Sequence, residues 1–313
     1  MTAAGRSRPD AVLLMGPTCS GKSDLALALA REFPVEIVSV DSALVYRGMD
    51  IGTSKPPAAV RGGIPHHLID VCDPAEAYSA GRFQRDATGL IEAIRARGRI
   101  PLLVGGTMLY FRSLVRGLAP LPEADPALRE QIDRRARELG WPALHRELAS
   151  RDPEAAARIR PADAQRIQRA IEVLELTGQP LSRLQQRAVP SRYRFRSFAL
   201  MPCHRDELYR RIDARFDEMM QAGLLDEVRR LFDRGDLGPE LPSIRAVGYR
   251  QLWAHLAGQR ALEDAVVDAR RATRQLAKRQ LTWLRAERGL EWVRGLEDRE
   301  LNSVRAVFSE ACP

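Results

Sequence analysis

The segment MGPTCSGKSD, residues 15–24, constrains the fold more than any other part of this sequence. Residues 16–23 satisfy the pattern GxxxxGK[S/T] of a phosphate-binding loop in full. The short apolar run AVLLM precedes the loop, and SDLALALAREF, with apolar residues at helical spacing, follows it. Because strand, loop and helix occur in the order that such a loop requires, we predict an anion site at the end of the first strand.

The loop residues have complementary roles toward a bound phosphate. Glycines let backbone N–H groups approach phosphate oxygens, and the N-terminus of the following helix adds partial positive charge. Lys22 neutralises the phosphate, and the hydroxyl of Ser23 can bind Mg²⁺. The pattern leaves open which phosphate compound binds.

Further strands indicate the fold class. The β-branched runs VEIVSVD (35–41) and IPLLVGG (100–106) are separated by the helical segment AGRFQRDATGLIEAIRARG. Strands that alternate with helices predict an α/β fold, a parallel sheet with helices on both faces and ligands at the carboxyl ends of its strands. FRSFALM (195–201) is predicted as a strand that returns to the sheet.

The region from 123 to 192 differs from its surroundings. It is rich in Arg, Glu and Ala and has no convincing strand, which predicts a mostly helical inserted domain. The catalytic core would then comprise 1–122 and 193–313. The core is predicted to end in helices over 205–222, 225–234, 246–257 and 263–288, and EWVRGLEDREL contributes an edge strand.

Composition narrows the partners and the compartment. Lys and Arg total 49 against 41 acidic residues, a net charge of +8 and a pI near 9.8. A polyanionic partner is therefore a candidate, although charge alone does not separate nucleic acid from a membrane. The cysteines at 19, 72, 203 and 312 contain no CxxC pair, so neither a disulfide framework nor a zinc site is indicated, and the cytoplasm is the expected location. No apolar run approaches the roughly 20 residues that span a bilayer, and we expect no membrane partner.

Two other strand ends carry polar residues. Asp41 directly follows the strand 35–40, where its carboxylate could hold Mg²⁺, act as a general base or cap the next turn. In VGGTMLY, Gly105 and Gly106 permit a close backbone approach, and Thr107 offers a hydroxyl to a ligand or a cap to the next helix.

Eight segments, in order over nearly the whole chain, resemble the tRNA dimethylallyltransferase family, also called the tRNA isopentenyltransferases. They are GPTCSGKSD, DSALVYRGMDIGTSKP, PHHLIDVCDP, YSAGRFQRDA, LLVGGTMLYFRSLVRGL, DAQRIQRAIEVLELTGQPLS, IRAVGYRQLW and TRQLAKRQLTWLR. The resemblance implies transfer of a dimethylallyl group from dimethylallyl diphosphate to N6 of the adenosine just 3′ of the anticodon. Two departures, Cys19 for the more usual Ala and Leu44 where many relatives have Gln, remove no chemical group that the reaction needs.

The same resemblance implies roles for individual residues. The fold would be P-loop nucleotide-kinase-like, and the loop would hold the diphosphate of the donor instead of ATP, with Mg²⁺ on Ser23. Asp41 would be the general base, Lys22 would stabilise the leaving group, and Thr107 would contact the adenosine or Asp41. The diphosphate-binding residues implied are Gly16, Pro17, Thr18, Cys19, Ser20, Gly21, Lys22, Ser23 and Arg215. Arg211, one helical turn before Arg215, is expected to pair with a neighbouring carboxylate.

The expected partner is the anticodon stem-loop of tRNA, from which the target base must be flipped into a pocket. We expect the protein to be a monomer. The last long helix carries a basic face, which could equally be a solvated surface. The predicted tRNA-binding residues are Asp41, Ser42, Ala43, Leu44, Thr107, Arg129, Gln165, Arg166, Ile167, Gln168, Arg169, Arg245, Gly248, Tyr249, Arg250, Lys278, Arg279, Gln280, Thr282, Trp283 and Arg285.

Two other functions fit parts of the sequence. A small-molecule or nucleotide kinase would share the phosphate loop and sheet, but the insertion and the basic C-terminal helices would be superfluous for a small acceptor. A non-catalytic RNA-binding protein is disfavoured because Lys22, Ser23 and Asp41 are all present. His66 and His67 lack metal-ligand partners in sequence and are expected to be structural.

Overall fold

The computed structural model describes residues 8–202, 204–295 and 298–311, which form two compact units. The larger unit contains the chain up to Ser113 and from Arg192 onward, and the smaller unit spans Leu114–Ser191. The sequence predicts that the smaller unit begins later, at residue 123, because the helical pattern begins only after the segment that connects the two units. Cys19 and Cys72 are free thiols, and residues 203 and 312 lie outside the described residues.

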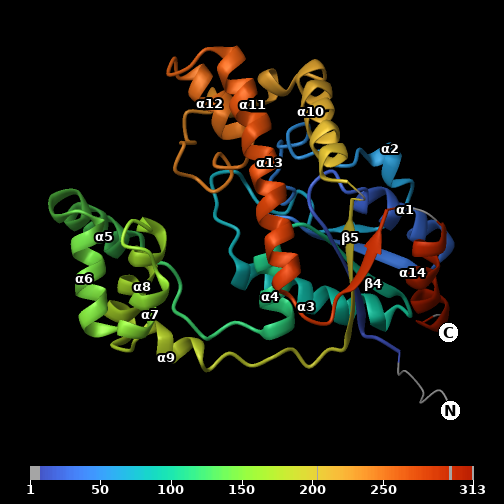
Figure 1. The fold of residues 1–313 in the computed structure, drawn as a ribbon, viewed down its shortest axis with the longest axis horizontal. Helices are drawn as coiled ribbons and strands as arrows, with labels where there is room; N and C mark the ends of the chain where they lie inside the picture. The colour runs from blue at the N-terminus through green and yellow to red at the C-terminus, as the bar shows by residue number, and fades with distance from the viewer. Residues whose placement is uncertain (1–7, 203, 296–297, 312–313) are drawn as a thin grey trace. The chain divides into compact units, whose positions relative to one another are not determined.

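The larger unit is built on a six-stranded sheet in which every neighbouring pair is parallel (Figure 1). The strands are β1 (Ala11–Met15), β2 (Val35–Val40), β3 (His66–His67), β4 (Ile100–Gly105), β5 (Phe195–Met201) and β6 (Glu291–Arg294), in the order β3-β2-β4-β1-β5-β6. The predicted parallel sheet, the strand β5 and the C-terminal edge strand are confirmed. The edge strand β3 is too short to show a period in the sequence.

The strand register brings three functional segments to one edge of the sheet. Met15 at the end of β1 is opposite Gly105 at the end of β4, and Gly105 is also opposite Val40 at the end of β2. The phosphate loop, Asp41 and Thr107 therefore leave the sheet at the same edge.

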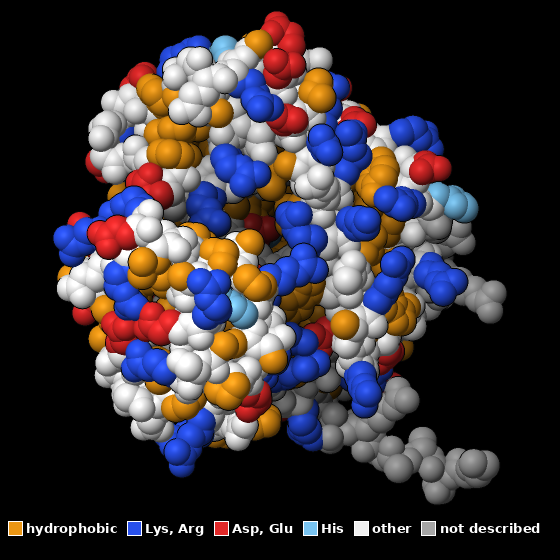
Figure 2. All heavy atoms as spheres, turned by 60° about the vertical axis from the view of Figure 1, so that its left-hand side comes forward, with side chains coloured by type: hydrophobic (Ala, Val, Ile, Leu, Met, Phe, Trp, Pro, Cys, Tyr) orange, Lys and Arg blue, Asp and Glu red, His pale blue; other side chains and the backbone are white. Residues whose placement is uncertain are grey.

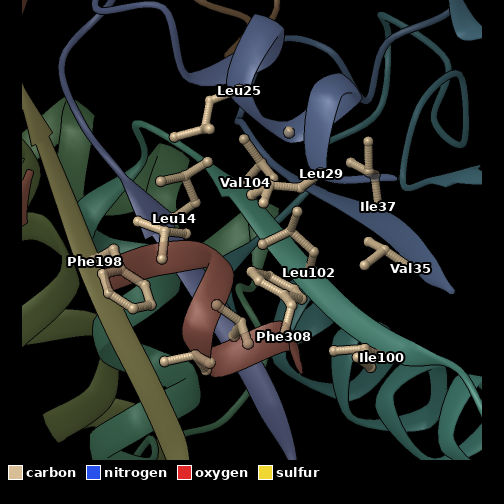
Figure 3. Packing of buried hydrophobic residues seen from close by; sticks show 14 of the residues in the cluster. Leu14, Leu25, Leu29, Val35, Ile37, Ile100, Leu102, Val104, Phe198 and Phe308 are labelled. Carbon is tan, nitrogen blue, oxygen red and sulfur yellow. The ribbon is translucent and has the colours of Figure 1, made fainter. Parts of the chain in front are cut away.

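Helices cover both faces of the sheet. On one face, α1 (Lys22–Glu32) and α14 (Asp298–Ala311) pack against the strands, and Figure 3 shows Leu25 and Phe308 close to Leu14 and its neighbours. Burying side chains of this kind stabilises the fold by about 1.5–3 kcal/mol each. The helix α3 (Ala80–Ala96) packs against β2 and β4 and buries Phe83, which lies outside that cluster, so the second face is covered too.

The remaining helices of the larger unit are α2 (Ala58–Arg61), α4 (Met108–Arg116, which crosses the unit boundary), α10 (Arg205–Gln221), α11 (Leu224–Phe232), α12 (Tyr249–Leu256) and α13 (Leu262–Ala286). The last four confirm the predicted C-terminal helical region within a few residues at each end. Leu208 and Ile212 of α10 pack against Ala277 of α13, with Leu281 at the edge of the cluster. The apolar row of α13 thus faces α10, and Arg270 and Arg274 of α13 also reach α10, where they pair with Asp217 and Asp213.

The smaller unit is helical throughout its secondary structure, as predicted. Its helices are α5 (Pro126–Leu139), α6 (Trp141–Arg151), α7 (Pro153–Arg158), α8 (Ala164–Thr177) and α9 (Leu181–Gln185). The side chains of Asp125, Asp152 and Asp163 accept hydrogen bonds from backbone N–H groups at the starts of α5, α7 and α8, which is how such N-caps stabilise a helix. Across the described part of the chain, no helix has the length and apolar character needed to cross a bilayer.

Candidate active site

The phosphate loop is held open by small residues at its base. A Cβ on Gly16 would lie 2.8 Å from the carbonyl oxygen of Leu200 and from Oγ of Ser20, so a side chain at Gly16 would force the loop apart. The Ser20 hydroxyl is buried, and it has no hydrogen-bond partner among the described residues. Because a buried hydroxyl without a partner is costly, a ligand oxygen is its natural acceptor.

Lys22 carries the main charge of the loop. Its Nζ donates to the carbonyl oxygen of Pro17 at 2.6 Å. Burial lowers the pKa of Lys22 to about 8, while the nearby Asp41 opposes this shift and the nearby Arg215 adds to it. Lys22, Asp41 and Arg215 all line the same cavity, so both charges lie near the loop.

Arg215 approaches the loop from α10. Its Nη1 lies 3.9 Å from Sγ of Cys19, and Cys19 packs against the apolar cluster between α10 and α13. Arg211 pairs with Glu207 on the same helix, as predicted. Two cationic side chains, Lys22 and Arg215, therefore flank the phosphate loop.

Asp41 lies at the opening of the turn after β2. Its Oδ1 accepts hydrogen bonds from the backbone N–H groups of Ala43 at 2.8 Å and Leu44 at 3.3 Å. Its other carboxylate oxygen makes no hydrogen bond to any described residue. The Thr107 hydroxyl accepts from the N–H of Ser42 at 3.0 Å, so in this structure Thr107 braces the Asp41 turn through Ser42 and does not bond Asp41 itself.

One large cavity, of about 1090 Å³, joins these segments. Its volume lies just above the usual range for small-molecule sites, so it has room for a donor and a flipped base. The predicted site residues that line it are Thr18, Cys19, Ser20, Gly21, Lys22, Ser23, Asp41, Ser42, Ala43, Leu44, Thr107, Arg215, Arg245, Tyr249, Arg279, Gln280 and Trp283.

Known proteins are similar to this chain in sequence and fold. A family model described as IPP transferase matches residues 44–287, and one described as isopentenyl transferase matches residues 9–63. This chain belongs to the IPP transferase family. Curated relatives named tRNA dimethylallyltransferase include that of Bordetella petrii, 58% identical over 88% of this chain and 89% of the relative. The relative of the same name from Alkalilimnicola ehrlichii is 59% identical, and the match covers 90% of this chain and 89% of the relative.

Solved structures agree with the family assignment. The full-length tRNA isopentenylpyrophosphate transferase of Bacillus halodurans is 38% identical, has a TM-score of 0.70, and the match covers 96% of this chain and 97% of that one. A eukaryotic dimethylallyltransferase acting on tRNA is 27% identical and has a TM-score of 0.80, and the match covers 95% of this chain and 77% of that one. The P-loop kinase-like fold predicted for this IPP transferase is thereby confirmed.

The structure corrects two of the predicted tRNA contacts. Tyr249 lies in the wall of the cavity, but it is completely buried and its hydroxyl donates to Glu227 at 2.5 Å, so its side chain is held within the protein and exposes no surface to RNA. Ile167 is completely buried in the core of the smaller unit. Both are apolar or aromatic residues inside otherwise basic motifs, where the helical period directs them inward. Gly248, which precedes Tyr249, is buried as well.

Other predicted contacts on the larger unit lie outside the cavity lining. Arg250, Lys278, Thr282 and Arg285 are exposed. Among the ion pairs of the described residues, none includes Lys278, Arg279 or Arg285. These cations are therefore available to a polyanion, and they stay predictions as tRNA contacts.

The predicted contacts on the smaller unit have partners within that unit. Arg129 and Arg169 both donate to Glu172, a completely buried carboxylate. Burial raises the pKa of Glu172, but the hydrogen bonds from the two arginines outweigh this effect and lower it. Gln168 donates to Asp133 at 2.7 Å. Gln165 and Arg166 are exposed.

Sequence reasoning missed Glu227, which organises the segment after the Asp41 turn. Its buried carboxylate accepts from the N–H groups of Asp50 at 2.9 Å, Ile51 at 2.8 Å and Gly52 at 3.1 Å, as well as from Tyr249. Burial raises the pKa of Tyr249, which keeps this hydroxyl a donor. Asp50–Gly52 belongs to the motif DSALVYRGMDIGTSKP, but Glu227 lies in an ordinary amphipathic pattern that gives no hint of the contact.

His66 and His67 have structural partners. Nδ1 of His66 lies 2.8 Å from the carbonyl oxygen of Ile64, and Nε2 of His67 lies 2.7 Å from Oε2 of Glu36. Burial lowers the pKa of His66. Within residues 8–202, 204–295 and 298–311, no group of three or more His, Cys, Asp or Glu side chains could hold a metal ion.

Proposed function

We propose that this IPP transferase moves the dimethylallyl group of dimethylallyl diphosphate to N6 of the adenosine 3′-adjacent to the anticodon, with Asp41 as the general base. Its activity as a tRNA dimethylallyltransferase follows from its family. The observation that carries the residue roles is the single cavity lined by Lys22, Asp41 and Thr107, where phosphate-binding and proton-accepting groups face the same space.

The donor diphosphate binds the phosphate loop in this proposal. Loop amides, Lys22 and Arg215 oppose the negative charge that grows on the diphosphate as the allylic carbon–oxygen bond breaks. The partnerless Ser20 hydroxyl supports this assignment, because it has no acceptor until a ligand oxygen arrives. Charges that stabilise the leaving group more than the bound donor accelerate the reaction.

Mg²⁺ fits the same site. Ser23 is exposed at the start of α1, and both Ser23 and Asp41 line the cavity with oxygen atoms, the ligand type that Mg²⁺ prefers. Two side-chain oxygens are too few to surround Mg²⁺ with protein ligands alone. Ser23 would therefore be the protein ligand, and the donor diphosphate would complete the coordination. Bound there, Mg²⁺ would neutralise diphosphate charge.

Asp41 acts on the acceptor. The adenine N6 lone pair is delocalised into the ring, so N6 attacks more easily as a base takes its proton. The N6–carbon bond forms, the carbon–oxygen bond to the diphosphate breaks, and the N6 proton passes to the Asp41 carboxylate. The backbone hydrogen bonds to Oδ1 hold the carboxylate in place while the other oxygen remains open to the amine.

The tRNA supplies the flipped base, and the protein offers cations and the Trp283 ring at the cavity. Arg245, Arg279 and Trp283 line it, and Arg112 stacks on the Trp283 ring with its guanidinium carbon 4.7 Å from the ring centre. Lys and Arg side chains are spread over the face shown in Figure 2, with acidic side chains among them. Phosphate contacts from such cations give affinity, and stacking holds an extruded base. The smaller unit would add Gln165 and Arg166. The monomeric state and the cytoplasmic location stay predictions.

A comparison of donors tests the proposal. The purified protein is titrated with a dimethylallyl thiolodiphosphate that cannot react and, separately, with ATP, both with Mg²⁺. We expect tighter binding of the isoprenoid, and transfer of the dimethylallyl group to an anticodon stem-loop in the absence of ATP. Tighter binding of ATP together with phosphoryl transfer would favour the kinase and would refute the donor assignment.

A further inference from the structure

One side chain of α13 joins the donor loop to the acceptor side of the cavity. The backbone N–H of Thr18, in the phosphate loop, donates to Oε1 of Gln280 at 2.9 Å. Nε2 of Gln280 donates to the carbonyl oxygen of Gly106 at 2.9 Å. Gly106 immediately precedes Thr107, and Gln280 lies 262 and 174 residues from its two partners. The amide thus spans two loops that carry different substrates in the proposed function.

The surroundings leave little freedom to this bridge. A Cβ on Gly106 would lie 2.3 Å from Nε2 of Gln280, so glycine at 106 lets the amide reach the backbone. Ala277 and Leu284, one turn to either side on α13, are completely buried and fix the helix. The amide group is planar, with its donor and acceptor at a constant separation, so it sets the distance between the two backbone atoms that it bonds.

We propose that Gln280 is a positioning residue, whose amide sets the spacing between the phosphate loop and the Gly106–Thr107 turn so that donor carbon and acceptor amine meet in line. This inference rests on the proposed function, and it gives Gln280 a role other than the predicted tRNA contact. Both polar ends of the amide are already bonded within the protein, which leaves little for RNA. Reactions of two bound substrates are sensitive to such spacing, since a misplacement of about 1 Å can cost about 100-fold in rate.

Gln280→Leu tests the bridge, with Gln275→Leu as the matched control. Gln275 is exposed on the same helix, so the control changes the same residue type without touching either loop. With saturating stem-loop and dimethylallyl diphosphate, we expect the single-turnover rate of Gln280→Leu to fall by about 30- to 100-fold. We expect the affinities for the unreactive donor analogue and for the stem-loop to stay within about threefold, and the control to match the wild type.

The variant Gln280→Glu adds a pH dependence of the transfer rate that a merely structural role of Gln280 would not produce. An ionised carboxylate can still accept from Thr18 N–H, but it repels the carbonyl oxygen of Gly106. A protonated carboxyl has one acceptor and one donor oxygen and so restores both bonds. The ratio of the variant rate to the wild-type rate should therefore rise as the pH falls from about 8 to about 5, toward the ordinary titration range of a glutamate.

Three outcomes overturn the inference. One is a Gln280→Leu rate within threefold of the wild type. Another is a loss confined to stem-loop affinity, which would return Gln280 to tRNA binding. If Gln280→Leu does not fold, Gln280→Glu decides, and a rate ratio that does not change with pH overturns the proposal. A wild-type protein that fails to transfer a dimethylallyl group would refute the proposed function instead, so the two failures are distinguishable.

Discussion

In the smaller unit the buried Glu172 accepts hydrogen bonds from Arg129, Arg169 and the N–H of Asp125, so its charge is balanced within the unit. In the larger unit the Ser20 hydroxyl is buried without a partner, and burial lowers the pKa of Lys22. The two sites, the Glu172 cluster and the phosphate loop, therefore differ in whether their buried polar groups are satisfied by the fold alone. Satisfied buried groups stabilise a structure, whereas unsatisfied groups in a cavity indicate where a ligand completes the hydrogen bonding.

The largest effect should come from Asp41→Asn, which tests the cavity side of this comparison. An amide of nearly the same shape cannot accept the proton, so the rate of the chemical step should fall by about 10²- to 10⁴-fold, or about 3 to 5.5 kcal/mol. The measurement is single-turnover transfer on a saturating stem-loop across Mg²⁺ concentrations. Recovery of the rate at high Mg²⁺ would mean that Asp41 chiefly positions the metal, and the general-base role would be wrong.

Lys22→Ala comes next. It removes one charge that faces the departing diphosphate, so kcat/KM for the donor should fall by about 100-fold or more, on the order of 3 kcal/mol. Arg135→Ala is the control from the smaller unit, because Arg135 is paired with Glu147 and Glu175. Equal kinetics for the Lys22 variant and the wild type would remove Lys22 from the site.

Glu172→Gln tests the buried cluster of the smaller unit, in which Arg129 and Arg169 balance the charge of Glu172. It weakens the hydrogen bonds of a buried acceptor, and it should lower the free energy of unfolding by about 1–3 kcal/mol, because the partly exposed arginines can turn to water. Since folding lowers the pKa of Glu172, its stabilisation is present above the unfolded pKa and is lost as pH falls through the folded value.

Urea unfolding and hydrogen exchange of α5 and α8 measure this effect. Glu147→Gln is the control, since Glu147 is a partly exposed ion-pair partner. Donor binding should be unchanged in Glu172→Gln. A variant as stable as the wild type would show that the buried carboxylate is not a structural anchor of the smaller unit.

The pH dependence of donor binding sharpens the contrast. Lys22, with a pKa of about 8, is charged below that pH, and a bound diphosphate favours its charged form and raises the pKa. Affinity for the unreactive donor analogue should be flat below pH 8 and then fall by up to about tenfold per pH unit. Calorimetric titration of the wild type and of Lys22→Met checks this. An affinity of the wild type that stays constant through pH 8 would contradict it.

The smallest expected effect concerns the unpaired cations of α13. If Lys278 and Arg279 contact phosphates, replacing either with Gln should reduce the slope of log affinity against log salt by about one unit. Arg135→Gln should leave the slope unchanged, because ion pairs within the smaller unit already hold that arginine. Slopes that are equal in all four proteins would mean that the basic face of α13 is a solvated surface.

Features encoded over a few neighbouring residues could be predicted from the sequence. The phosphate loop, the strands at 35–40, 100–105 and 195–201, and the long helix ending in Ala286 follow from periods and glycine positions, and the structure confirms them. The two-residue strand β3 has no period to detect. Tyr249 and Ile167 were misassigned because a basic motif does not reveal which of its residues the helix turns inward.

The sequence by itself determined that Lys22, Ser23, Asp41 and Thr107 follow strands, because loop and strand patterns are local. Only the tertiary structure decided that parallel register brings these strand ends to one cavity. The Gln280 bridge and the Glu227 anchor also belong to the tertiary structure, since each joins atoms more than a hundred residues apart. Such contacts depend on the path of the whole chain, and no local pattern in an amphipathic helix distinguishes a bridging glutamine from a solvated one.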